Sequence, residues 1–387
     1  MPTGSTSQAA WIRTSAEVAE LVASLAGARG LALDTEADSL HHYREKVCLI
    51  QIASEEGRAW LLDPLAGGDL TPLGQVLADP AVTKVLHGAD YDIVGLRRDF
   101  SFRLTNVFDT MVAARFLGLA EIGLQALLGS ELGVQVSKSS QRDDWSRRPL
   151  TPVQEDYALS DVRHLLLLRR RLEERLRGLE RLSWLEEECE AVASLEPSRR
   201  GRNGEAYLRI KGAGALSPRG LAVLRELAAW RERRAEEKDV PPFRVLDPKT
   251  LLLIASRPPT SRGELHRSVP FLSRQERNAA EILEAVLKAM ALPENELPGK
   301  KTRPRPAVPA LTARRIAGLR AWRTREATQL GLDVAVVLPQ RLLEAVAEAD
   351  PEDAEALVAI EGFRRWRAAA LGPGVLAVLA DARGAPD

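Results

Sequence analysis

The alternation of apolar and polar positions predicts a β-rich first part of the chain and a helical remainder. Short runs rich in Val, Ile and Leu are typical of strands, and five occur early, at residues 30–33, 47–53, 59–62, 82–87 and 106–108. The turn at residues 55–57 joins the second run to the third as a predicted hairpin. Apolar positions at helical spacing predict helices at residues 72–79, 91–98, 111–117, 124–132 and 152–179. Antiparallel strands followed by alternating strands and helices indicate an α/β domain with a mixed sheet flanked by helices.

Two later segments resemble each other and are predicted to be helical. Each contains a helix with a Trp-Arg pair, a turn, and a Leu-rich helix opened by a Pro. We interpret them as an internal duplication of a small all-α unit, separated from their neighbours by basic linkers rich in Gly or Pro. The predicted order begins with a disordered lead-in (1–10), the α/β domain (11–196) and a basic linker (197–215). A first helical domain (216–296), a Pro-rich linker (297–310) and a diverged second helical domain (311–382) follow.

The composition indicates a protein without membrane segments. The 387 residues are 45% hydrophobic and 28% charged, and no apolar run approaches the roughly 20 residues that span a bilayer. The first residues lack the layout of a secretory signal. Cys48 and Cys189 are isolated, without zinc-ligand spacing or a disulfide framework. We therefore expect a cytoplasmic location.

The net charge is zero, but the two signs are distributed unevenly. Residues 1–196 contain 21 basic and 30 acidic side chains, a balance of −9. Residues 197–310 contain 23 basic and 13 acidic side chains, whereas residues 311–387 contain 10 and 11. An acidic domain beside a basic one fits a metal site next to a phosphate-binding surface. Arg-rich helices are also common as solvated faces, so charge alone does not establish nucleic-acid binding.

The first candidate motif is Asp34-Thr35-Glu36, at the end of the first predicted strand. Residues two apart on a strand point to the same side, with Cα atoms about 7 Å apart. Two buried carboxylates repel each other and lose hydration unless a cation compensates them. The pattern Asp-x-Glu is common by chance and gains weight only from the motifs that follow.

The second candidate motif spans His87 to Asp92, after a predicted strand. Asp92 is expected in the first turn of the next helix, where the helix dipole favours a carboxylate. Asp90 is predicted to cap that helix at its N-terminus. We interpret His87 as a structural histidine rather than a metal ligand.

The third candidate motif is Tyr157 with Asp161, inside the predicted helix 152–179. A spacing of four residues places the phenol and the carboxylate on one helical face, about one turn apart. By itself this pattern equally fits an amphipathic helix with a half-buried Tyr and a solvated Asp.

Together the motifs supply four carboxylates from three separated elements: Asp34, Glu36, Asp92 and Asp161. Two Mg²⁺ or Mn²⁺ ions would neutralise their four negative charges. Two such ions about 3.5–4 Å apart are a recurring device for phosphodiester cleavage, in which one activates water and the other stabilises the leaving oxygen. The combination therefore predicts a metal-dependent nuclease.

In order and context, these motifs resemble the three exonuclease motifs of the DEDDy class of 3′→5′ exonucleases, which have a ribonuclease H-like fold. Over about residues 10–195 the chain is similar to the ribonuclease D family, in the segments VCLIQIA (47–53), KVLHGADYDI (84–93), FDTMVAARFLG (108–118) and SKSSQRDDWSRRPLTPVQEDYALSDVRHL (137–165). The two helical segments resemble the HRDC module, which ribonuclease D contains twice. The first is a good match, and the second is diverged but keeps its ending.

The resemblance implies an exoribonuclease that removes nucleoside 5′-monophosphates one at a time from RNA 3′ ends, with structured RNA such as tRNA precursors as substrate. It implies that the four carboxylates bind two divalent metal ions, Mg²⁺ or Mn²⁺, with Asp34 bridging them. It also implies that Tyr157 orients or deprotonates the attacking water. An unperturbed phenol has a pKa of about 10, so we expect orientation to matter more. No obligate protein partner is evident.

Several side chains of the 137–165 segment and of the first helical domain are candidates for RNA contact. Trp145 could stack on a base or pack against the following helix, and the charged side chains could meet phosphate or remain solvated. Trp230 is predicted to lie in a core, because its spacing from Leu224 and Leu227 is helical. The candidate set is Lys138, Gln141, Arg142, Trp145, Arg148, Arg231 and Arg234.

Two alternative functions remain open at this point. One is a DNA 3′→5′ exonuclease with a role in repair, because the choice between RNA and DNA depends on contacts to the 2′-hydroxyl that a sequence does not reveal. The other is a nucleic-acid-binding scaffold with a silent nuclease domain. The complete set of carboxylates argues against the scaffold.

Overall fold

The computed structural model describes residues 10–136, 139–197, 205–299 and 308–384. The chain divides into two compact units. The first comprises Met1–Ala37, Val47–Pro197 and Val308–Asp387, and the second comprises Asp38–Lys46 and Ser198–Ala307. The α/β domain and the second helical module therefore belong to one unit, and the first helical module belongs to the other.

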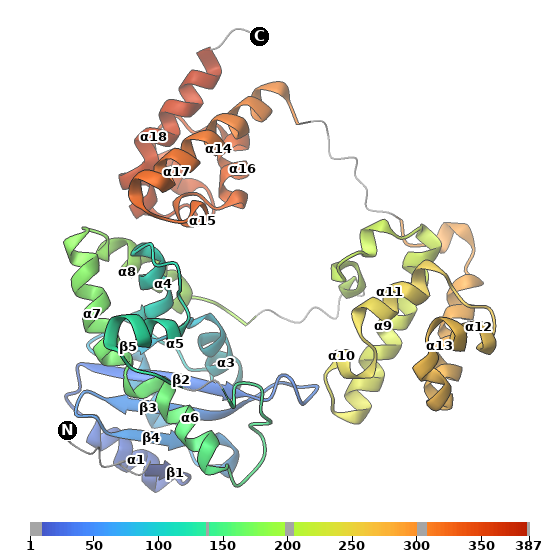
Figure 1. Cartoon of the computed structure of the whole chain (residues 1–387), viewed down its shortest axis with the longest axis horizontal. Helices are drawn as coiled ribbons and strands as arrows, with labels where there is room; N and C mark the ends of the chain where they lie inside the picture. The colour runs from blue at the N-terminus through green and yellow to red at the C-terminus, as the bar shows by residue number, and fades with distance from the viewer. Residues whose placement is uncertain (1–9, 137–138, 198–204, 300–307, 385–387) are drawn as a thin grey trace. The chain divides into compact units, whose positions relative to one another are not determined.

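The first unit is built on a six-stranded sheet with the strand order β1-β4-β3-β2-β5-β6 (Figure 1). The strands are β1 (Ala10–Ile12), β2 (Gly30–Ala37), β3 (Val47–Ser54), β4 (Ala59–Leu62), β5 (Thr83–Leu86) and β6 (Val107–Asp109). Strand β3 pairs antiparallel with both β2 and β4, whereas β1, β5 and β6 add in parallel. The predicted mixed sheet and its hairpin are confirmed.

Helices cover both faces of this sheet, and every residue of the central strand β3 is buried. On one face Leu49 and Leu61 pack with Tyr157 and Ala158 of helix α6. On the other face Ile50 joins the main core. The helices of this domain are α1 (Ser15–Ser24), α2 (Thr71–Ala78), α3 (Asp90–Phe100), α4 (Thr110–Phe116), α5 (Leu124–Leu127), α6 (Pro152–Arg163), α7 (Leu165–Gly178) and α8 (Leu182–Ala193).

Three boundaries differ from the expectation. Strand β2 runs to Ala37 because its second half pairs with β3, so Asp34 and Glu36 lie within a strand and not at its end. The predicted helix 152–179 is two helices, divided at His164. Residue 10, assigned to the lead-in, pairs with β4 as part of β1, while residues 1–9 lie outside the described residues.

The second unit contains the first helical module, which has its own apolar core. Trp230 is buried there and donates from Nε1 to Glu281 at 2.8 Å, which confirms its predicted core position. Tyr207 and Ala213 belong to the same core, so the predicted linker 197–215 was too long. The helices are α9 (Pro218–Lys238), α10 (Pro242–Val245), α11 (Pro248–Ser256), α12 (Arg262–Ser268) and α13 (Glu276–Met290).

The second helical module packs on helix α8, inside the first unit. The Trp366 ring stacks on Trp184 with centroids 4.6 Å apart, and Phe116 meets it edge-on at 5.2 Å. The apolar core is continuous from the sheet into this module. Its helices are α14 (Ala310–Leu330), α15 (Val334–Val337), α16 (Gln340–Ala349), α17 (Ala354–Ala359) and α18 (Arg365–Gly384). None of the described helices has the length and apolar character that crossing a membrane requires.

Candidate active site

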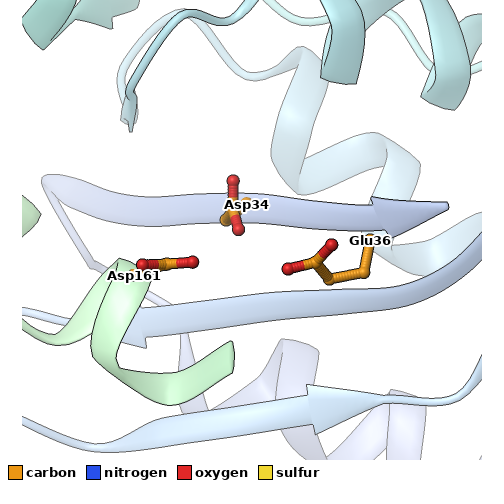
Figure 2. A group of neighbouring side chains, drawn as sticks. All are labelled: Asp34, Glu36 and Asp161. Atoms are coloured by element: carbon orange, nitrogen blue, oxygen red, sulfur yellow. The ribbon is translucent and has the colours of Figure 1, made fainter. Parts of the chain in front are cut away.

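Three of the four predicted carboxylates converge between strand β2 and helix α6 (Figure 2). One oxygen from each of Asp34, Glu36 and Asp161 lies within 4.8 Å of the other two. Asp34 and Glu36 share one face of β2 because side chains alternate along a strand. Asp161 reaches them from α6, whose start is held by the Thr151 capping box. The geometry suits a divalent cation, because carboxylate oxygens are hard ligands for Mg²⁺ or Mn²⁺.

The electrostatics of this group also favour a bound cation. Burial, together with the neighbouring carboxylates, raises the pKa values of Asp34 and Glu36 well above their usual range. Burial raises the pKa of Asp161 to about 6. Among the described residues, none of the three forms an ion pair with a basic side chain. Like charges held together in a desolvated place, without such a partner, need a cation to stay ionised.

Asp92 lines the same pocket but stands slightly apart. It lies in the first turn of α3, as predicted, and accepts a hydrogen bond from the Thr35 hydroxyl at 2.5 Å. Burial raises its pKa to about 7. It is not part of the group within 4.8 Å, but its negative charge helps to raise the pKa of Asp34. Asp92 therefore shares the pocket with the other three carboxylates but lies outside their cluster.

Asp109 holds the turn that carries Asp92, and sequence analysis did not single it out. Its carboxylate accepts from the backbone N–H groups of Gly88 at 3.0 Å, Ala89 at 2.8 Å and Met111 at 2.8 Å. It thereby ties the start of α3 to the start of α4. The predicted cap at Asp90 is wrong, because Asp90 is the first residue of α3 and the N-cap residue is Ala89, whose side chain cannot cap. The signal available in the sequence was an Asp directly after the predicted apolar strand at residues 106–108.

His87 is placed as a structural histidine. Its Nδ1 lies 2.9 Å from the Thr110 hydroxyl, which itself donates to the Leu86 carbonyl. Burial lowers the pKa of His87, so the neutral ring is favoured. His87 lines the carboxylate pocket but is not part of the three-residue oxygen cluster.

Tyr157 lies one turn before Asp161 on α6, and the two side chains line the same pocket. Burial and the nearby carboxylates raise the pKa of the phenol, so it keeps its proton at neutral pH. A neutral hydroxyl in this position can orient a water molecule but is a poor general base.

The pocket around these residues has a volume of about 370 Å³. Apolar side chains of Met111, Leu124 and Val136 line it together with the carboxylates. Gln141, a candidate for RNA contact, is exposed and also lines the pocket. The acidic side chains could meet a phosphate only through bound cations, whereas the apolar side chains suit the face of a base.

The other candidates from the same segment have different outcomes. Trp145 is only 1% exposed and packs beside Tyr157, with ring centroids 6.0 Å apart, so base stacking is ruled out in this structure. Arg148 pairs with Asp63 at 2.6 Å and donates to the Cys48 carbonyl, which makes it a structural residue. Arg142 is exposed. Lys138 lies outside the described residues.

The two arginines of the first helical module are also poorly placed for RNA. The side chains of Arg231 and Arg234 are 12% and 11% exposed. Arg231 lies near Glu232, Arg234 pairs with Glu237, and burial lowers the pKa of Arg231. Both side chains are therefore mostly covered by their own domain. Contact of these two side chains with RNA stays a prediction.

Comparison with known proteins agrees with this geometry. Residues 9–177 match the family model described as 3′-5′ exonuclease, and residues 220–286 and 313–379 each match the HRDC domain. The chain is 34% identical over 375 residues to Ribonuclease D of Pseudomonas paraeruginosa, covering 96% of this chain and 98% of that protein. The chain belongs to the ribonuclease D family. It is also 32% identical to Ribonuclease D of Desulfotalea psychrophila, over 84% of this chain and 87% of the relative.

Solved structures extend this relation. This ribonuclease D family member superposes with a TM-score of 0.71 on Escherichia coli RNase D, described as an exoribonuclease involved in structured RNA processing. The two are 26% identical, with 96% of this chain and 99% of that chain covered. A protein from Bifidobacterium adolescentis shares the fold, with a TM-score of 0.79 at 23% identity. Both helical modules are thus HRDC domains, including the diverged second copy.

Proposed function

We propose that this ribonuclease D family member is a two-metal 3′→5′ exoribonuclease that releases nucleoside 5′-monophosphates. In the reaction, water adds to the terminal phosphodiester, the P–O3′ bond breaks, and the shortened RNA leaves with a 3′-hydroxyl. The observation that carries the proposal is the convergence of Asp34, Glu36 and Asp161 on one point, half-buried and without a basic partner among the described residues.

The residues of the pocket take distinct roles in this proposal. Asp34, Glu36 and Asp161 would hold one cation, and Asp34 with Asp92 would hold the second. Bound cations would acidify the attacking water and stabilise the leaving oxygen. The neutral Tyr157 hydroxyl orients the water, and Asp109 keeps Asp92 in place through the turn before α3. Gln141 and the apolar wall contact the terminal nucleotide.

The proposed substrate is structured RNA, with tRNA precursors as the first candidates. The relation to E. coli RNase D, described as acting in structured RNA processing, supports this choice. The basic charge of residues 197–310 supports a role of the first HRDC domain in holding the body of the RNA. We also propose that the protein acts in the cytoplasm, where such precursors occur, and needs no protein partner.

The test uses the whole protein and a 5′-labelled tRNA precursor with a 3′ trailer. With Mg²⁺ or Mn²⁺ we expect stepwise shortening and 5′-monophosphates, and with a chelator no reaction. Asp34→Ala should lower the rate by about 10³-fold or more, since several kcal/mol of charge stabilisation is lost. RNA binding in a gel-shift assay should persist. Glu20→Ala, an exposed acidic residue on α1, is the control and should retain full activity.

The alternatives give different results in the same assay. Matched RNA and DNA strands would be degraded at equal rates, or the DNA faster, if the protein were a DNA exonuclease. A silent scaffold would bind RNA and leave it intact at every metal concentration. Either result would contradict the proposal.

A further inference from the structure

The side-chain amide of Gln51 lies unpaired in the centre of the sheet. Gln51 occupies the middle of β3 and is fully buried. Neither its Oε1 nor its Nε2 has a hydrogen-bond partner among the residues that the structure describes. Buried polar side chains nearly always have such partners, because an unpaired amide loses its hydration without compensation. The stability of the sheet therefore does not explain the unpaired amide of Gln51, and another role must be considered.

The strand register places Gln51 beside the carboxylate group. Gln51 lies directly opposite Asp34 on β2 and opposite Leu61 on β4. Side chains that oppose each other across antiparallel strands share a face, with Cβ atoms about 5 Å apart. Leu61 packs beneath α6 with Tyr157. Gln51 is therefore on the face that carries Asp34 and is covered by α6.

This face of β2 carries two carboxylates, of which Asp34 lies directly opposite Gln51, whereas Glu36 lies opposite Leu49. Two residues along β3 in either direction, the same face carries Leu49 and Ala53, and across β4 it carries Leu61. A glutamine amide has two N–H donors and one acceptor oxygen. A carboxylate that is held ionised is a stronger acceptor for such a donor than a neutral group.

We propose that Gln51 is a positioning residue for Asp34, donating from Nε2 to the Asp34 carboxylate when divalent cations occupy the pocket. This inference rests on the proposed function. The hydrogen bond fixes the rotamer of the residue that both cations would share. Groups that orient metal ligands in this way typically change metal affinity or activity by about 10- to 100-fold when removed.

The replacement Gln51→Met separates this role from a structural one. Methionine has nearly the same length and volume but no amide. A structural amide would lower the melting temperature of the metal-stripped protein when lost, whereas an unpaired one leaves it equal or higher. We expect the Mn²⁺ affinity of the stripped protein, measured by calorimetry, to fall by about 10-fold or more. We expect kcat to fall by a similar factor, with the KM for RNA within about twofold of wild type.

Leu61→Met is the matched control, because it places the same side chain on the same buried face without removing an amide. It should bind Mn²⁺ and turn over RNA as wild type does. Gln51→Leu serves as a second variant if Gln51→Met does not fold, and the same losses are expected. Unchanged Mn²⁺ affinity and kcat in a folded Gln51 variant would overturn the proposal, as would a lower melting temperature with normal kcat. An inactive wild type would instead defeat the proposed function itself.

Discussion

Two groups of acidic side chains in the first unit have opposite surroundings. In the carboxylate pocket, Asp34 and Glu36 are half-buried beside other carboxylates, and desolvation together with those neighbours raises their pKa values. At the contact between α8 and α18, the Glu187 carboxylate accepts hydrogen bonds from the backbone N–H groups of Arg365 and Trp366, with N···O distances of 2.7 and 2.8 Å. Glu188 next to it contacts Arg364 and Arg367 at 3.3 and 3.4 Å.

The presence or absence of basic and N–H partners distinguishes a structural contact from a binding site. Acidic groups that meet helix N–H donors and arginines are stabilised by the fold itself. Acidic groups that meet only each other destabilise the fold until a cation arrives. We therefore expect replacements in the pocket to lower activity without lowering stability, and replacements at the α8–α18 contact to do the reverse.

The largest expected effect is that of Asp161→Asn on activity. Losing a metal ligand should lower kcat by about 10³-fold or more. The metal-stripped protein should melt at the same or a higher temperature, because one of three mutually repelling groups becomes neutral. Single-turnover assays and thermal denaturation after chelation measure the two quantities. A clear fall in the melting temperature would contradict the view that repulsion between these carboxylates destabilises the metal-free fold.

Trp366→Ala tests the structural contact between α8 and α18. Trp366 is 5% exposed between Trp184 and Phe116, and truncating a buried Trp typically costs about 3–5 kcal/mol. Chemical denaturation should show this loss in the free energy of unfolding. Well below the melting temperature, kcat on a short single-stranded RNA should be unchanged. Unchanged stability would mean that the second HRDC domain does not depend on this contact.

Glu188→Gln should have a smaller effect of the same kind. The variant leaves the buried guanidinium of Arg367 without its charged partner, and the expected cost is about 1–3 kcal/mol. Glu186→Gln, an exposed position on the same helix, is the matched control and should be neutral. Equal stability of the two variants would show that the ion pair contributes nothing.

The smallest expected effect is the pH dependence of the metal-stripped protein. The folded-state pKa values of Asp92 and Asp161, about 7 and about 6, lie above the ordinary value of an Asp. The folded protein therefore binds more protons than the unfolded chain in this range, so stability falls as pH rises through 6 to 7. The melting temperature should rise modestly from pH 8 to pH 5.5. Mn²⁺ affinity should fall over the same interval, and a flat profile of both quantities would contradict the assignment.

The sequence predicted the sheet domain, the duplicated helical modules and the residues of the pocket because each leaves a local pattern. Strands such as 47–53 are continuous apolar runs, and Tyr157 and Asp161 have helical spacing. Burial was predicted less well. Trp145, Arg148, Arg231 and Arg234 looked available for RNA, but whether a polar or aromatic side chain faces solvent depends on elements that are distant in the chain.

By itself the sequence determined the family, the order of domains and the identity of the acidic motifs, because these depend on residue type and spacing along the chain. Only the tertiary structure decided that Asp34 faces Asp161, that Gln51 is unpaired beside Asp34, and that the second HRDC domain packs on α8. These are contacts between segments far apart in the chain. Their energies come from burial and from the register of paired strands, which no local pattern contains.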